Sequence, residues 1–130
     1  MNLLLVSHLG LASGMVKAAQ FITESQDEIY YVELDERGIN LFKTRLAEML
    51  DSFDKDEELV LVSDIPAGSP GNTGLEMLLK SNFDFQYFSG MNLGMILEIT
   101  LSGSPENAVL AGTASIRGQT DKPESSDEDF

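Results

Sequence analysis

Short apolar runs alternate along this chain with longer segments in which apolar residues recur every three or four positions. The short runs have the length of buried strands and lie at residues 3–6, 29–34, 59–63 and 85–88. The periodic segments predict amphipathic helices at residues 11–22, 39–53, 69–79 and 93–97. Strands that alternate with helices predict a mainly parallel sheet with helices on both faces. We therefore expect a doubly wound α/β fold with strand order 2-1-3-4.

Two details of this pattern carry more specific expectations. In the first helix, the apolar positions predict which face lies on the sheet, namely Leu11, Met15, Ala18, Ala19 and Ile22. At the start of the third helix, Ser69 can cap and Pro70 suits the first helical position, where its missing N–H costs nothing.

The carboxyl-terminal part of the chain has a weaker pattern. Residues 106–111 suit one or two helical turns, and residues 113–117 are the candidate for a short fifth strand. From residue 118 to residue 130 the composition becomes acidic and rich in serine, which is typical of a disordered tail. We expect one domain over residues 1–117, followed by this tail.

Composition excludes several classes of function. The 130 residues carry a formal net charge of −14, which argues against nucleic acid as a partner because phosphate contacts need clustered lysine and arginine. The chain has no cysteine, and its one histidine leaves no recognisable metal-ligand spacing. No apolar run approaches the roughly 18 residues that would cross a bilayer, and we expect no secretory signal, because the first residues lack a basic region. We expect a cytoplasmic protein without a cofactor or metal.

The candidate chemistry lies where the first and third strands end. The first strand ends on His8, the only histidine, and the third delivers Asp64 to its own carboxyl end. In the order 2-1-3-4 these strands flank the point where the strand order switches direction, which is where sites form in such folds. Asp64 could then hydrogen-bond one imidazole nitrogen and leave the other as a nucleophile for phosphorus. The hydroxyl of Ser69 and nearby backbone N–H groups, at the amino end of a helix, would hold the phosphoryl oxygens.

These residues belong to three motifs in a recognisable order. Ser7-His8 is followed by Ser63-Asp64 with Gly68-Ser69-Pro70, and then by Ser89-Gly90-Met91-Asn92-Leu93. Over about residues 1–117, the chain resembles the enzyme IIA component of the mannose/fructose/sorbose family of the bacterial phosphoenolpyruvate-dependent sugar phosphotransferase system.

The resemblance implies a phosphohistidine relay in sugar uptake. His8 would accept the phosphoryl group from the histidine-containing phosphocarrier protein and pass it to a separate enzyme IIB component, with Asp64 as its hydrogen-bonded partner. Gly68 and Ser69 would bind the phosphoryl group. The candidate partner-docking residues are Leu9, Met91 and Asn92. The family also implies a homodimer, and residues 113–117 are the candidate for an antiparallel strand exchanged between its subunits.

Four positions depart from the family pattern. Leu9 and Ala67 stand where glycine is usual, Gly71 replaces a larger residue, and Gly94 replaces a common proline. Two alternatives stay open at the level of sequence. One is the phosphoryl-transfer subunit that serves dihydroxyacetone kinase, and the other is a non-catalytic regulator that kept the fold.

Overall fold

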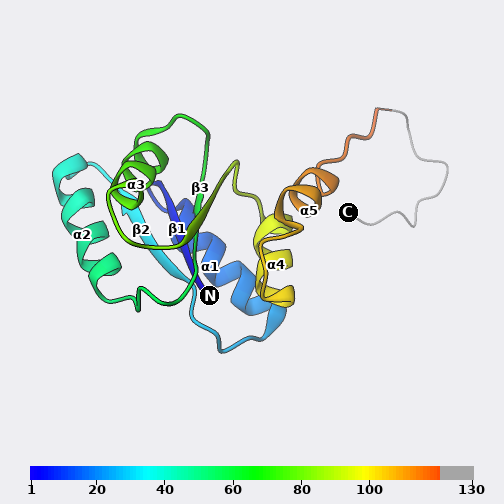
Figure 1. The fold of residues 1–130 in the computed structure, drawn as a ribbon. Helices are drawn as coiled ribbons and strands as arrows, with labels where there is room; N and C mark the ends of the chain where they lie inside the picture. Colours follow the sequence, from blue (N-terminus) through cyan, green and yellow to red (C-terminus); the bar gives the residue numbers. More distant parts are fainter. Residues whose placement is uncertain (121–130) are drawn as a thin grey trace.

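The computed structural model describes residues 1–120, and most of the predicted acidic tail lies outside these residues. Four strands alternate with four helices, and a fifth helix follows (Figure 1). The strands are β1 (Asn2–His8), β2 (Tyr30–Leu34), β3 (Leu59–Ser63) and β4 (Phe85–Ser89). The helices are α1 (Leu11–Thr23), α2 (Ile39–Asp51), α3 (Ser69–Leu79), α4 (Leu93–Ser102) and α5 (Ala108–Ala114).

The sheet has the predicted order, β2-β1-β3-β4, and all three neighbouring pairs are parallel. Pairing of β1 with β3 aligns Val6 with Ser63, so that the two strands end side by side. The direction of the strand order changes between them. This arrangement confirms the α/β fold class and places the carboxyl ends of β1 and β3 at the switch point.

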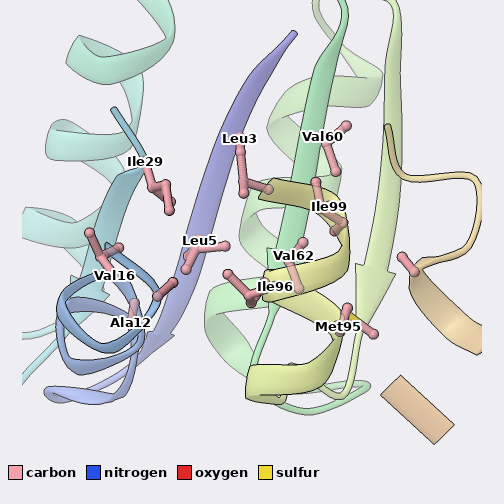
Figure 2. Close-up of a cluster of buried hydrophobic side chains, with 12 residues drawn as sticks. Leu3, Leu5, Ala12, Val16, Ile29, Val60, Val62, Met95, Ile96 and Ile99 are labelled. Carbon is pink, nitrogen blue, oxygen red and sulfur yellow. The ribbon is translucent and has the colours of Figure 1, made fainter. Parts of the chain in front are cut away.

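Each face of the sheet has its own core, because side chains alternate along a strand. Leu3 and Leu5 of β1 point to one face, where helices α1 and α4 cover them (Figure 2). Leu4 and Val6 point to the other face, where α2 and α3 pack. Because helices cover both faces of the sheet, successive residues of β1 and β3 are buried, which explains why these strands have continuous apolar runs.

The prediction of which face of α1 lies on the sheet is wrong in part. Ala12, Val16 and Ala19 are the buried residues of this helix, whereas Leu11 and Ile22 are 56% and 52% exposed. The small side chains at positions 12 and 19 allow the helix to lie close to the sheet. Periodicity alone did not distinguish the two apolar stripes that this helix carries.

Within the single chain, residues 113–117 do not form the predicted fifth strand. Residues 113 and 114 complete α5, and residues 116–120 have no regular structure. Helix α5 packs on α4, with Ala108 and Gly112 buried in the contact. A side chain at Gly94 of α4 would lie 2.7 Å from the Ser115 Cβ, so this departure from the family pattern fits the close approach of α5.

Candidate functional site

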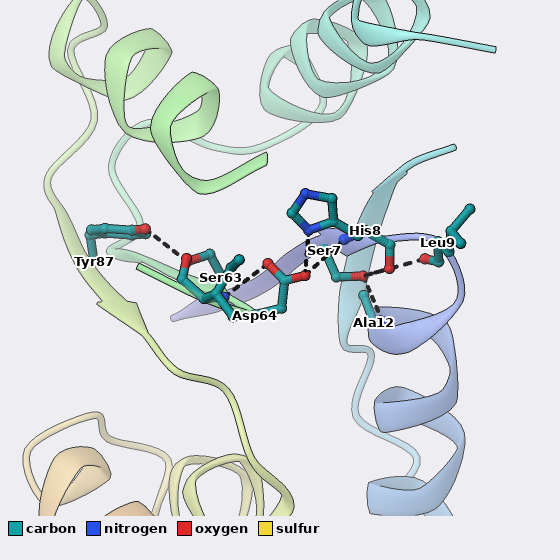
Figure 3. A network of polar contacts seen from close by, with 8 residues as sticks. Ser7, His8, Leu9, Ala12, Ser63, Asp64 and Tyr87 are labelled. Atoms are coloured by element: carbon teal, nitrogen blue, oxygen red, sulfur yellow. Dashed lines mark hydrogen bonds and ion pairs between the residues drawn. The ribbon is translucent and has the colours of Figure 1, made fainter. Parts of the chain in front are cut away.

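His8 and Asp64 meet at the carboxyl ends of β1 and β3, as the sequence predicts (Figure 3). The ring nitrogen Nδ1 of His8 lies 2.8 Å from Asp64 Oδ2. The same oxygen accepts the backbone N–H of His8 at 2.9 Å. The other oxygen, Oδ1, accepts the backbone N–H of Ile65 at 3.0 Å. The carboxylate is therefore held from both sides and aimed at the ring.

The two side chains differ in exposure in a way that suits nucleophilic chemistry. The side chain of Asp64 is 7% exposed, whereas that of His8 is 43% exposed. Burial of the Asp64 carboxyl acts to raise its pKa, but the hydrogen bonds from His8 and Ile65 outweigh this effect and lower the pKa. An ionised Asp64 accepts a hydrogen bond from Nδ1–H, which fixes the tautomer that leaves the Nε2 lone pair free.

The amino end of α3 lies against the His8 ring. Gly68 is the N-cap residue, and a Cβ at this position would lie only 3.2 Å from His8 Cε1. The predicted side-chain cap by Ser69 is absent, because the helix begins at Ser69 itself. Among the described residues, the Ser69 hydroxyl has no hydrogen-bond partner, and no side chain accepts from the first turn of α3. This turn is open to an anion.

Three other helices begin at this edge, and in two of them, α1 and α4, side chains already accept first-turn N–H groups, whereas α2 has no side-chain cap. In α1, the Ser7 hydroxyl accepts the N–H of Ala12 at 2.9 Å, and Glu33 of β2 accepts the N–H of Ser13 at 2.8 Å. In α4, the Asn92 side chain accepts the N–H of Met95. The start of α3 is the uncapped one that lies against the His8 ring, so it is the one placed to meet a phosphoryl group on that ring.

Two turns beside the site use a left-handed backbone without glycine. Leu9 has φ of 44° and Ala67 has φ of 61°. Such a conformation costs a residue with a Cβ about 1–2 kcal/mol, which explains why glycine suits both positions. The Leu9 side chain is 59% exposed next to His8. Leu9 therefore combines backbone strain with an apolar side chain at the edge of the site.

The predicted docking residues Met91 and Asn92 also have internal contacts. The N–H of Met91 donates to the carbonyl of Ser63 at 3.0 Å, and its partly buried side chain packs on the core. Besides capping α4, the Asn92 side chain donates to the Gly112 carbonyl at 2.9 Å. These contacts join the turn after β4 to β3 and α5.

Sequence reasoning gave no role to three polar residues of this network, namely Ser7, Ser63 and Tyr87. Ser7 and Ser63 are fully buried, and each directly precedes a site residue. Ser63 Oγ lies 2.7 Å from the Tyr87 hydroxyl. The repeated order Val-Ser-His and Val-Ser-Asp at the two strand ends is the signal that could have revealed the serines.

Residues 1–120 show neither a metal-binding cluster nor a membrane-spanning helix. Residues 1–120 contain no cluster of three His, Asp or Glu side chains that could hold a metal ion. In the same residues, no helix is both long enough and apolar enough to span a membrane.

Comparison with known proteins identifies the family. The family model described as the PTS system fructose IIA component matches residues 2–111. The mannose/sorbose-specific IIA subunit from Enterococcus faecalis has the same fold, with a TM-score of 0.83 and 21% identity over 95% of this chain and 97% of that chain. The PTS IIA protein associated with the fucose utilization operon of Streptococcus pneumoniae has a TM-score of 0.72 and 23% identity, covering 90% and 91%. No curated protein matches the sequence.

The family match covers most of the chain, and the fold, including the strand order, agrees with these solved IIA structures. The chain therefore belongs to the fructose IIA family of the sugar phosphotransferase system, and it is a phosphotransferase component that relays phosphoryl groups in sugar uptake.

Proposed function

We propose that His8 is the residue that carries the phosphoryl group, on Nε2. The donor is the histidine-containing phosphocarrier protein, and the acceptor is a separate enzyme IIB component. The bond between phosphorus and the donor nitrogen breaks as the bond to Nε2 forms, and a second exchange of the same kind passes the group to IIB. The cytoplasmic location expected from the sequence is part of this proposal.

The contact between His8 and Asp64 is the observation that carries the proposal. Attack by Nε2 leaves positive charge on the imidazole ring, and the carboxylate lies 2.8 Å from Nδ1 to stabilise it. The ring is exposed enough to be reached, while its partner is buried. A partner protein can therefore approach Nε2 without displacing the group that orients the ring.

Gly68 and Ser69 are the proposed contacts of the phosphoryl oxygens. The open first turn of α3 lies beside the ring, and the Ser69 hydroxyl is exposed and without a partner among residues 1–120. Backbone N–H groups and a hydroxyl can hold a phosphoryl group without a metal ion.

Leu9 is the proposed docking residue. During transfer the phosphorus atom lies between His8 and the partner protein, so the partner must also cover Leu9, which is next to His8. Met91 and Asn92 support this surface by holding the adjoining turn. We also propose a homodimer. The exposed apolar residues Val109 and Leu110 of α5 support such a contact, which sedimentation equilibrium would measure directly.

Phosphorylation by purified system proteins tests the site. The chain is incubated with phosphoenolpyruvate, enzyme I and the phosphocarrier protein, alongside its His8→Ala variant. We expect one acid-labile phosphate per wild-type chain and none on the variant. Equal labelling of the two would refute His8 as the site. A wild-type chain that accepts no phosphate would instead support the non-catalytic regulator.

A further inference from the structure

Hydrogen bonds joined through the backbone of Ile65 link Tyr87 of β4 to His8 on β1 (Figure 3). The Tyr87 hydroxyl lies 2.7 Å from Ser63 Oγ, and Ser63 Oγ donates to the Ile65 carbonyl at 3.3 Å. The N–H of Ile65 donates to Asp64 Oδ1, and Asp64 Oδ2 receives His8. The orientation of the Asp64 carboxylate is thus linked to a tyrosine two strands away from the histidine.

The direction of these bonds follows from the number of protons. Ser63 has one hydroxyl proton, which it gives to the Ile65 carbonyl. With that bond made, the Ser63 oxygen accepts a hydrogen bond from the Tyr87 hydroxyl. Because Ser63 is fully buried, no water reaches it to replace this donor.

The same two hydroxyl groups determine how closely α3 approaches the sheet. A Cβ at Gly71 in the first turn of α3 would lie 2.7 Å from Ser63 Oγ and closer still to the Tyr87 hydroxyl. Only glycine fits there without movement, so the hydroxyl of Tyr87 occupies the space that a larger residue at position 71 would need. The hydroxyl pair therefore contacts both the helix start proposed to bind phosphate and the turn that holds Asp64.

We propose that Tyr87 is a positioning residue for His8 that acts through Ser63 and the turn at Ile65. It sets the direction of the Asp64 carboxylate and, through this carboxylate, the tautomer of the His8 ring. This proposal rests on the proposed function of His8. It assigns to Tyr87 a role in the chemistry, beyond filling space in the middle of β4.

Replacement of Tyr87 by phenylalanine tests the proposal. The Tyr87→Phe variant removes one hydroxyl and keeps the ring, and Tyr31→Phe is the matched control, because Tyr31 is 43% exposed on the edge strand β2. Two quantities are measured: the His8 tautomer by ¹⁵N NMR and the rate of phosphorylation by the phosphocarrier protein. We expect Tyr87→Phe to populate the Nε2–H tautomer and to slow phosphorylation about fivefold, and Tyr31→Phe to change neither.

A second variant separates positioning from folding. Ser63→Ala removes the link itself, so the double variant with Tyr87→Phe should be no slower than Ser63→Ala alone. Additive losses in the double variant would overturn the proposal, as would a Tyr87→Phe variant with wild-type tautomer and rate and only a lower melting temperature. If wild-type His8 accepts no phosphate, the proposed function fails, while the tautomer still tests Tyr87.

Discussion

The carboxylate of Asp64 offers the sharpest test of the mechanism, because asparagine has nearly the same shape without the charge. In Asp64→Asn the side-chain oxygen can still accept the N–H groups of His8, so the ring keeps its place. What is lost is the attraction between a negative carboxylate and the positive charge that develops on the ring, together with the bond from the Ile65 N–H, which the amide NH2 cannot accept. The rate of phosphoryl transfer to His8 therefore reports this electrostatic contribution plus the loss of that one bond.

The size of the effect follows from the geometry. Two unit charges about 4 Å apart attract by ~1 kcal/mol in water and by ~4 kcal/mol at an effective dielectric constant of about 20. Asp64 is buried but the His8 ring is 43% exposed, so the contribution lies between these limits. A value of ~2 kcal/mol corresponds to phosphorylation that is roughly 30-fold slower.

The assay is the initial rate of labelling from the phosphocarrier protein, measured under conditions in which the wild-type chain is labelled at His8 alone. The control is Asp84→Asn, which changes the net charge equally. Asp84 is exposed and directly precedes β4, at the opposite end of the sheet from His8. A rate for Asp64→Asn within twofold of wild type would refute the electrostatic role, and an equal slowing by Asp84→Asn would point to net charge instead.

Two further substitutions test packing and docking. Gly71→Ala should destabilise the fold by about 1–3 kcal/mol, because its methyl group meets the hydroxyls of Ser63 and Tyr87. Denaturant unfolding measures this loss, and adding Tyr87→Phe should recover part of it; no recovery would contradict the assigned contact. Leu9→Ala keeps the positive φ but removes exposed apolar surface, so KM for the phosphocarrier protein should rise about fivefold while labelling by phosphoramidate stays unchanged. Equal slowing with both donors would argue against docking.

Much of the site could be predicted from the sequence because strand ends are local features. An apolar run that stops at His8 and another that stops before Asp64 give two strand ends, and the order 2-1-3-4 places them together. The 2.8 Å contact between the two side chains agrees with this prediction. The chemical roles of the two residues remain for the phosphorylation experiments to decide.

The hydroxyl network could not be predicted in the same way. Tyr87 follows Ser63 by 24 positions, and nothing in the local pattern says that their hydroxyls meet. Likewise, the positive φ of Leu9 depends on where the chain must turn between β1 and α1. Such contacts depend on the distances between elements, which the hydrophobic pattern does not contain.

By itself, the sequence determined the order of strands and helices, the two-faced burial of β1 and β3, and the residues that these strands deliver to the edge of the sheet. Local spacing and side-chain polarity are enough for these features. Only the tertiary structure decided which stripe of α1 is buried and that residues 113 and 114 belong to a helix. The reason is physical: Ala12 and Gly112 are buried because their small size permits close contact with a neighbouring element, and that neighbour is known only once the chain is folded.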